Sequence, residues 1–155
     1  MKIGVPKEIK PQETRIGLTP DSVKDLVSNG HEVLIEKNGG TEAGFDNSHY
    51  SSAGAKIIDK AEDIFQDSEI IVKVKEPLSS EIQMIRENQI VFTYLHLAAA
   101  KELTQGLINS KGVCIAYETV TDQNGRLPLL APMSAVAGRM SVQAGCTLFR
   151  KKSKR

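Results

Sequence analysis

Three side chains of this sequence are of types that hold and transform small carboxylate substrates. Arg15 lies in a polar loop, where a guanidinium can hold a carboxylate through two parallel hydrogen bonds. Lys75 ends the β-branched run Ile70–Val74, so its ammonium group can donate to a carboxylate or carbonyl oxygen. His96 follows the run Ile90–Leu95, and an imidazole suits general acid–base work near neutral pH. Together these residues predict a small-molecule site.

Each of these residues also has a plainer interpretation. A loop arginine is commonly solvated, a lysine at a sheet edge commonly keeps its charge in water, and a histidine is often a hydrogen-bonded core residue. Glu118 could pair with one of the cations, orient His96, or form an ordinary ion pair. Ser134 could cap a helix whose N-terminus adjoins a cofactor phosphate, or capping could be its whole role.

The elements that must position these residues alternate between short strands and amphipathic helices. Thr19 is expected to cap the first helix, with Pro20 at its first position and Gly30 as its stop. Ser80 and Gln83 have the spacing of a capping box. The expected strands are Lys2–Val5, His31–Glu36, Ala55–Ile58, Glu69–Val74, Ile90–Tyr94 and Val113–Ala116, and the later helices Asn47–Ala53, Lys60–Gln66, Ser79–Asn88, Ala100–Ser110 and Ser134–Phe149.

This alternation predicts an α/β fold, a Rossmann-like and mostly parallel sheet with helices on both faces, ending in a long linker helix. Such sheets bind ligands at the carboxyl ends of their strands. That rule places five polar residues at or just beyond strand ends, in the loops where a site would form: Lys73, Lys75, Tyr94, His96 and Glu118.

Composition excludes several classes of function. The chain has 155 residues, 40% hydrophobic and 25% charged, which is typical of one water-soluble domain or one domain plus a fragment. We expect no nucleic-acid partner, because no basic stripe is interleaved with aromatic residues, and no membrane partner, because no apolar run approaches about 20 residues. Cys114 and Cys146 form no metal or disulfide pattern and favour a cytoplasmic location. No metal site and no glycine-rich nucleotide fingerprint is found.

Several motifs in order resemble the family that alanine dehydrogenase shares with the α-subunit of nicotinamide nucleotide transhydrogenase. The resemblance covers about positions 1 to 145, and the segment from Tyr94 to Ala98 favours the alanine dehydrogenase branch. The transhydrogenase α-subunit remains an alternative. The matching segments are Met1–Lys10, Glu13–Pro20, Gly30–Val33, Ala53–Ala55, Val72–Pro77, Phe92–Ala98, Ala116–Val120, Leu129–Ser134 and Val136–Arg139.

The resemblance implies an oxidoreductase that converts L-alanine, NAD and water to pyruvate, ammonium and NADH. It implies that Arg15 and Lys75 bind the small-molecule substrate, L-alanine or pyruvate, and that His96 is the catalytic acid–base group. It further implies that Ser134 contacts the cofactor NAD, and that the protein forms a homo-oligomer. The residues expected to line or support the site are Tyr94, Glu118 and Met133.

The sequence departs from the family after Gly145, where members continue into a glycine-rich segment and a Rossmann domain. We expect a substrate domain at 1–133, an interdomain linker helix at 134–149 and a basic tail at 150–155, with the NAD-binding domain absent. The hypothesis is a truncated product that is inactive alone and poorly soluble, because apolar residues of the last helix lose their cover. The alternative is a non-catalytic remnant, a pyruvate-binding module or an interaction module.

Overall fold

The computed structural model describes residues 1–152, with side chains for residues 1–149. The predicted basic tail at 150–155 therefore lies outside the described side chains. The chain divides into two compact units, the first from Met1 to Ala116 and the second from Tyr117 onwards. Each unit is described by itself.

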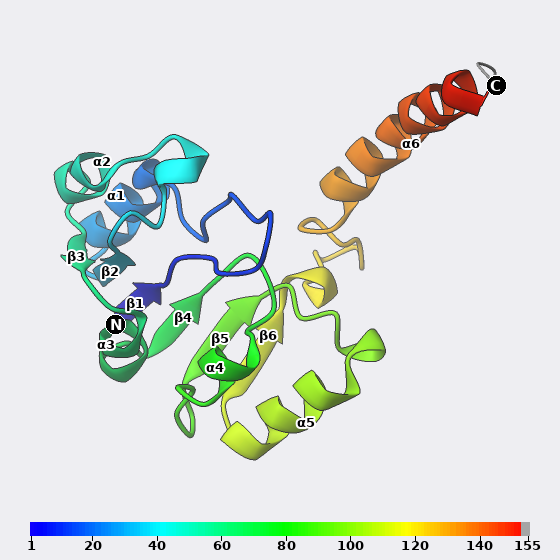
Figure 1. Ribbon diagram of the computed structural model, residues 1–155. Coiled ribbons are helices and arrows are strands. Elements are labelled where there is room, and N and C mark those ends of the chain that lie inside the picture. The colour runs from blue at the N-terminus through cyan, green and yellow to red at the C-terminus, as the bar shows by residue number, and fades with distance from the viewer. Residues whose placement is uncertain (153–155) are drawn as a thin grey trace. The chain divides into compact units, whose positions relative to one another are not determined.

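The first unit is built on a six-stranded parallel sheet with the strand order β3-β2-β1-β4-β5-β6 (Figure 1). All six predicted strands are present, and every neighbouring pair is parallel, as the βα alternation indicates. The central strand β1 lies between β2 and β4, so that Ile3 is paired with Val33 on one side and Ile70 on the other. The strands are β1 (Lys2–Val5), β2 (Glu32–Glu36), β3 (Lys56–Ile58), β4 (Ile70–Val72), β5 (Ile90–Thr93) and β6 (Val113–Ala116).

Helices and short 3-10 turns connect the strands. The first helix begins as predicted, with Thr19 Oγ1 accepting a hydrogen bond from Ser22 N at 3.3 Å and Pro20 at the first turn. Its chain reverses at Gly30, whose φ of 83° favours glycine. The helices are α1 (Pro20–Ser28), α2 (Asn47–Ser52), α3 (Ala61–Asp67), α4 (Ser79–Ile82), α5 (Lys101–Ser110) and α6 (Ala131–Lys152), and the 3-10 turns η1 (Thr41–Ala43), η2 (Leu97–Ala99) and η3 (Tyr117–Thr119).

Two predictions about helix starts are wrong. The capping box is not formed by Ser80 and Gln83, because α4 is a single turn in which the buried Glu81 carboxylate accepts the Leu78 N–H at 2.9 Å. The predicted helix Ser79–Asn88 accordingly ends at Ile82. Ser134 is not an N-cap either, because α6 begins at Ala131 and the Ser134 N–H already donates to the carbonyl of Leu130.

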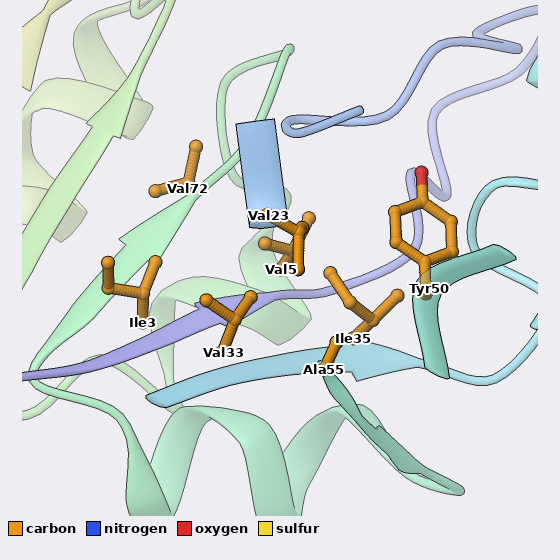
Figure 2. Close-up of a cluster of buried hydrophobic side chains, with 8 residues drawn as sticks. All are labelled: Ile3, Val5, Val23, Val33, Ile35, Tyr50, Ala55 and Val72. Carbon is orange, nitrogen blue, oxygen red and sulfur yellow. The ribbon is translucent and has the colours of Figure 1, made fainter. Parts of the chain in front are cut away.

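The sheet separates two hydrophobic clusters. On one face, Val23 of α1 and Tyr50 of α2 pack against the side chains of β1 and β2, as Figure 2 shows. On the other face, α3, α4 and α5 pack on β4 and β5 through a cluster that includes Ile64, Phe65 and Leu107. Helices therefore cover both faces of the sheet, as predicted, and the loops at the strand ends are held by a packed core.

The second unit contains η3, a turn and the long helix α6. Its turn includes Asn124 and Gly125, with Gly125 at a φ of 72° and its N–H donating to the carbonyl of Asp122 at 3.0 Å. The side chains of Val136, Met140 and Leu148 on α6 are each more than half exposed. None of the helices that the structure describes is long and apolar enough to cross a membrane.

Candidate functional site

The strand order reverses direction between β1 and β4, because the chain runs from β1 outward to β2 and β3 and then returns to β4. Loops that leave the carboxyl ends of strands at such a point diverge and leave room for a ligand. The loop after β1, residues 6–19, carries Arg15, and the segment after β4 carries Lys75. The segment after β5 carries Tyr94 and His96. Four of the predicted site residues therefore leave three neighbouring strands at the same edge.

Hydrogen bonds join these three segments to one another. The carboxylate oxygen Oε1 of Glu8, in the first loop, accepts from the backbone N–H of Val74 at 2.6 Å and of Lys75 at 3.3 Å. The hydroxyl of Thr93 donates to the Lys75 carbonyl at 2.9 Å, and the Tyr94 N–H donates to the Val74 carbonyl at 3.2 Å. Because buried backbone groups are satisfied in this way, the position of the Lys75 backbone is set by both neighbouring loops.

Arg15 is held by a carboxylate from its own loop. Its Nε lies 2.7 Å from Glu13 Oε1 and its Nη2 lies 2.6 Å from Glu13 Oε2, a bidentate pair. The hydrogen bond from Arg15 lowers the pKa of Glu13 to about 2, and the pair raises the pKa of Arg15. The guanidinium has five N–H donors. The edge formed by Nη1 and the second Nη2 hydrogen therefore remains available for another carboxylate.

Lys75 lies close enough to Arg15 and Glu13 to share their electrostatic field. Its positive charge contributes to the lowered pKa of Glu13, after the larger effect of Arg15. Among the ion pairs of residues 1–149, none involves the Lys75 ammonium group. A half-buried ammonium group in this position can donate to a carboxylate or a carbonyl oxygen.

His96 faces a second carboxylate. Its Nδ1 lies 3.8 Å from Glu76 Oε2, while the other oxygen of Glu76 is bonded by the Lys10 ammonium group. Burial is the largest single effect and raises the pKa of Glu76, but the hydrogen bond and charge of Lys10, a backbone hydrogen bond and the charge of His96 together outweigh it, so the pKa of Glu76 lies below its usual value. The ring of Tyr94 lies 6.3 Å from that of His96. His96 is therefore flanked by an acidic and an aromatic side chain.

The backbone of His96 is itself unusual. Its φ of 51° and ψ of 38° place it in the left-handed region, which few non-glycine residues occupy. This conformation turns the chain sharply after β5 and begins η2. Backbone strain of this kind is concentrated at functional sites, and it motivates the assignment of His96 to one.

Lys73 does not lie in the site, contrary to the prediction from its strand-end position. Its side chain is only 1% exposed, and its Nζ lies 3.2 Å from Glu8 Oε2 and 2.7 Å from Glu81 Oε1. These three residues form a buried ionic triad, which joins the first loop, the end of β4 and the start of α4. A lysine buried to this extent requires such partners, because an unpaired charge in the interior is costly.

The remaining predicted residues belong to the second unit. Glu118 lies in η3 and is half-buried, whereas Met133 and Ser134 lie in α6 and are exposed. These three residues belong to a different unit from Arg15, Lys75 and His96. Their roles beside the substrate stay predictions.

The residues present do not fit a dinucleotide cofactor on their own. The strand order is that of a dinucleotide-binding fold, in which a short glycine-rich turn after β1 brings the pyrophosphate to a helix N-terminus. Here the corresponding loop, residues 6–19, is long and carries the carboxylates of Glu8 and Glu13. The same loop also carries Lys7, Lys10 and Arg15, so it is the missing glycine-rich turn, and not the charge of the loop, that does not fit a pyrophosphate. Within residues 1–152, no group of three or more His, Cys, Asp or Glu residues could hold a metal ion.

A pocket of about 540 Å³ opens beside Glu76, between the start of α4 and the start of α5. It includes Glu76 but neither Arg15 nor Lys75. The two cationic side chains that are predicted to bind the substrate therefore lie outside this pocket.

Sequence reasoning missed the carboxylates that hold the predicted cations and base. Glu13 lies two residues before Arg15, so proximity along the chain was an available signal for it, whereas Glu76 bonds Lys10 and faces His96, which are both distant in the sequence. Glu8 gave no such signal, because its contacts with β4 span more than sixty residues of sequence.

Known proteins that are similar to this chain belong to one family. Residues 4–137 match the family described as alanine dehydrogenase/PNT, N-terminal domain. The chain is 52% identical to an alanine dehydrogenase of Staphylococcus epidermidis over 97% of this chain and 40% of that protein. It is 50% identical to one of Halomonas elongata over 97% of this chain and 41% of that protein. The chain thus spans about two fifths of the length of these relatives.

Solved structures give the same result. A structure of L-alanine dehydrogenase superposes with a TM-score of 0.87 and 54% identity, covering 94% of this chain and 40% of that one. A transhydrogenase from Sinorhizobium meliloti superposes with a TM-score of 0.73 and 24% identity, covering 79% of this chain and 36% of that one, which shows a shared fold alone. With the family match extending over most of its length, the chain belongs to the alanine dehydrogenase/PNT N-terminal domain family.

Proposed function

We propose that this chain is the substrate-binding part of an L-alanine dehydrogenase and that its first unit binds pyruvate or L-alanine. The observation that carries the proposal is the pair of cations at the β1/β4 reversal. Arg15 keeps one edge of its guanidinium available, and Lys75 has no ion-pair partner among the described residues. A carboxylate with an adjacent carbonyl group matches these donors.

Each residue then has a separate role. The available edge of Arg15 binds the substrate carboxylate, and the Lys75 ammonium group donates to the carbonyl oxygen and polarises it. His96 exchanges a proton with the substrate as water adds to or leaves the carbon that carries nitrogen. Glu76 faces Nδ1 of His96 and orients the ring. Tyr94, Glu118 and Met133 are proposed to line the site.

For the cofactor, the proposal covers its role in the reaction but not a complete binding site. NAD would accept the hydride, and the residues present do not fit it, so we assign its binding to residues outside these 155. Ser134 is proposed as a contact to it from α6. The division into a substrate domain at 1–133 and a linker helix at 134–149 stays a prediction. A cytoplasmic location is proposed because Cys114 and Cys146 are both free.

Calorimetric titration of the chain with pyruvate tests the proposal. Saturable binding is expected, and Lys75→Met should weaken it about tenfold to a hundredfold, because a hydrogen bond to a charged group is lost. Arg15→Met should weaken binding further, because it also leaves the Glu13 carboxylate without its cation. The matched control is Glu62→Gln on the exposed surface of α3, which should bind as the wild type does.

The absence of binding by a folded wild-type chain would overturn the proposal in favour of a non-catalytic remnant. Equal binding by the wild type and Lys75→Met would overturn the assigned site. NADH formation from L-alanine and NAD provides a separate check. We expect none, and turnover would contradict the assignment of the cofactor to residues outside this chain.

A further inference from the structure

The cations around the candidate site are almost all matched by carboxylates. Lys10 is paired with Glu76, and Arg15 with Glu13. The buried Lys73 faces two carboxylates, those of Glu8 and Glu81. Within the described side chains, Lys75 alone in this group has no ion pair. The cluster therefore presents little uncompensated positive charge, although it contains four cations.

Glu13 is the carboxylate that lowers the net positive charge beside Arg15 and Lys75. Its side chain is 7% exposed, whereas that of Arg15 is 48% exposed, so the carboxylate lies beneath the guanidinium that faces solvent. Arg15 keeps the pKa of Glu13 near 2, so this negative charge is present throughout the physiological range. Two cations, Arg15 and Lys75, and one carboxylate, Glu13, together carry a net charge of one positive, and the charges of Lys7 and Glu42, which line the same small hollow as Arg15 and Glu13, cancel each other.

We infer that Glu13 is a specificity-determining residue, whose carboxylate restricts the site to anions with a single negative charge. The inference rests on the proposed function, because it assumes that the anion binds to Arg15 and Lys75. A monocarboxylate matches the net charge of the site. A dianion would bring its second charge close to Glu13, with the Glu8–Lys73–Glu81 triad adding another negative charge behind the strand end.

The same carboxylate also positions Arg15. Because Glu13 occupies Nε and one hydrogen of Nη2, the guanidinium presents only its outer edge to a ligand. Glu13→Gln removes the negative charge and retains a side chain of the same size. Glu13→Asp retains the charge and shortens the side chain. These two variants separate the effect of charge from the effect of shape.

Oxamate and oxalate are the probes, because they are nearly isosteric analogues of pyruvate and differ by one negative charge at neutral pH. Calorimetry should give tighter binding of oxamate than of oxalate to the wild-type chain. In Glu13→Gln, the ratio of the two dissociation constants should shift toward oxalate by about tenfold at low ionic strength. Glu13→Asp should keep the wild-type ratio. Glu62→Gln, an equal change of net charge on the surface of α3, should also keep it.

The possible failures are distinguishable. If the folded wild type binds neither pyruvate nor oxamate, the proposed function fails and the inference fails with it. If the wild type prefers oxamate and Glu13→Gln keeps the same ratio, the inference alone is overturned. Thermal unfolding of Glu13→Gln, followed by circular dichroism, verifies that the ratio is measured on folded protein. If that variant is unfolded, Glu13→Asp decides, because a ratio shifted toward oxalate with the charge retained would also overturn the inference.

Discussion

The buried triad of Glu8, Lys73 and Glu81 offers the sharpest test of how this fold holds its site. Lys73→Met keeps a long unbranched side chain and removes the only cation of the triad. Two carboxylates with side chains at most 3% exposed then face each other without compensation. Breaking a buried ion pair on one side costs about 3–5 kcal/mol of unfolding free energy.

That loss is large relative to the total stability of a domain, which is about 5–15 kcal/mol. For a chain of this size, about 1 kcal/mol lowers Tm by about 2–4 °C, so Lys73→Met should lower Tm by about 10 °C or more. Thermal unfolding followed by circular dichroism at neutral pH measures the effect. The control is Lys111→Met. The Lys111 ammonium group lies 3.4 Å from the exposed carboxylate of Glu87, and loss of this surface pair should change Tm by no more than about 2 °C.

A triple variant identifies the cause of the loss. Glu8→Gln and Glu81→Gln, combined with Lys73→Met, leave the triad with no charge, and most of the lost stability should return. The reasoning would be refuted if Lys73→Met changed Tm no more than Lys111→Met does. It would also be refuted if the triple variant were less stable than Lys73→Met, because the loss would then come from packing or hydrogen bonding rather than from unpaired charge.

Three further predictions concern single side chains. The pKa of Glu13 is near 2 in the folded chain and near 4.5 in the unfolded chain, so Glu13→Gln should be less stable than the wild type at pH 6. In urea titrations, this difference in unfolding free energy should disappear as pH falls from about 5 to 2. A difference that stays constant with pH would contradict the ion pair. Gly4→Ala should cost about 1–3 kcal/mol in denaturant unfolding, because its Cβ would lie 2.3 Å from Ser68 Oγ, and a neutral result would contradict the close packing of β1. Burial raises the pKa of Tyr50 to about 12, so the Tyr50 phenol should stay largely un-ionised at pH 11 in an ultraviolet titration. Tyr50→Phe should abolish the absorbance change above pH 11 and should cost about 1 kcal/mol of unfolding free energy, because it loses the hydrogen bond to the Leu18 carbonyl.

Most of the fold could be predicted because its signals are local. Strands such as Lys2–Val5 and Val113–Ala116 have the predicted bounds, since a short β-prone run between turn residues indicates a strand whether it is buried, as β1 is, or at the sheet edge, as β6 is. The start of α1 also follows local rules, because Thr19 and Pro20 both act within one turn. The alternation of these elements was then sufficient to predict a parallel sheet with helices on both faces.

The errors arose where distant contacts decide local structure. Gln83 was predicted to complete a capping box, but Glu81 is drawn inward by Lys73 and takes the Leu78 N–H instead. Lys73 and Lys75 have the same residue type and differ by two positions, yet one is buried and the other half-buried. Lys73 is paired with Glu8, far away in the sequence, and with Glu81, whereas no ion pair of Lys75 is found among the described side chains. A pattern read along the chain contains no information about that contact.

The candidate site, like the fold, was predictable where the signal is local in the sequence and not where distant contacts decide. The rule that ligands bind at carboxyl strand ends pointed to Lys75, Tyr94 and His96, which do leave neighbouring strands at one edge, and also to Lys73, which is buried instead. It could not reveal the carboxylate behind each functional group, such as Glu13 behind Arg15. Those partners set the charge of the site, and they became visible only with the folded structure.

Amide chemical shifts of the isotopically labelled chain, recorded during a titration with pyruvate, test the central claim most directly. The account predicts saturable shifts confined to the segments that follow β1, β4 and β5, around Arg15, Lys75 and His96, with no change in α3, which carries none of the predicted site residues. Spectra of a folded chain that do not change with pyruvate, or shifts that centre away from these three strand ends, would contradict it.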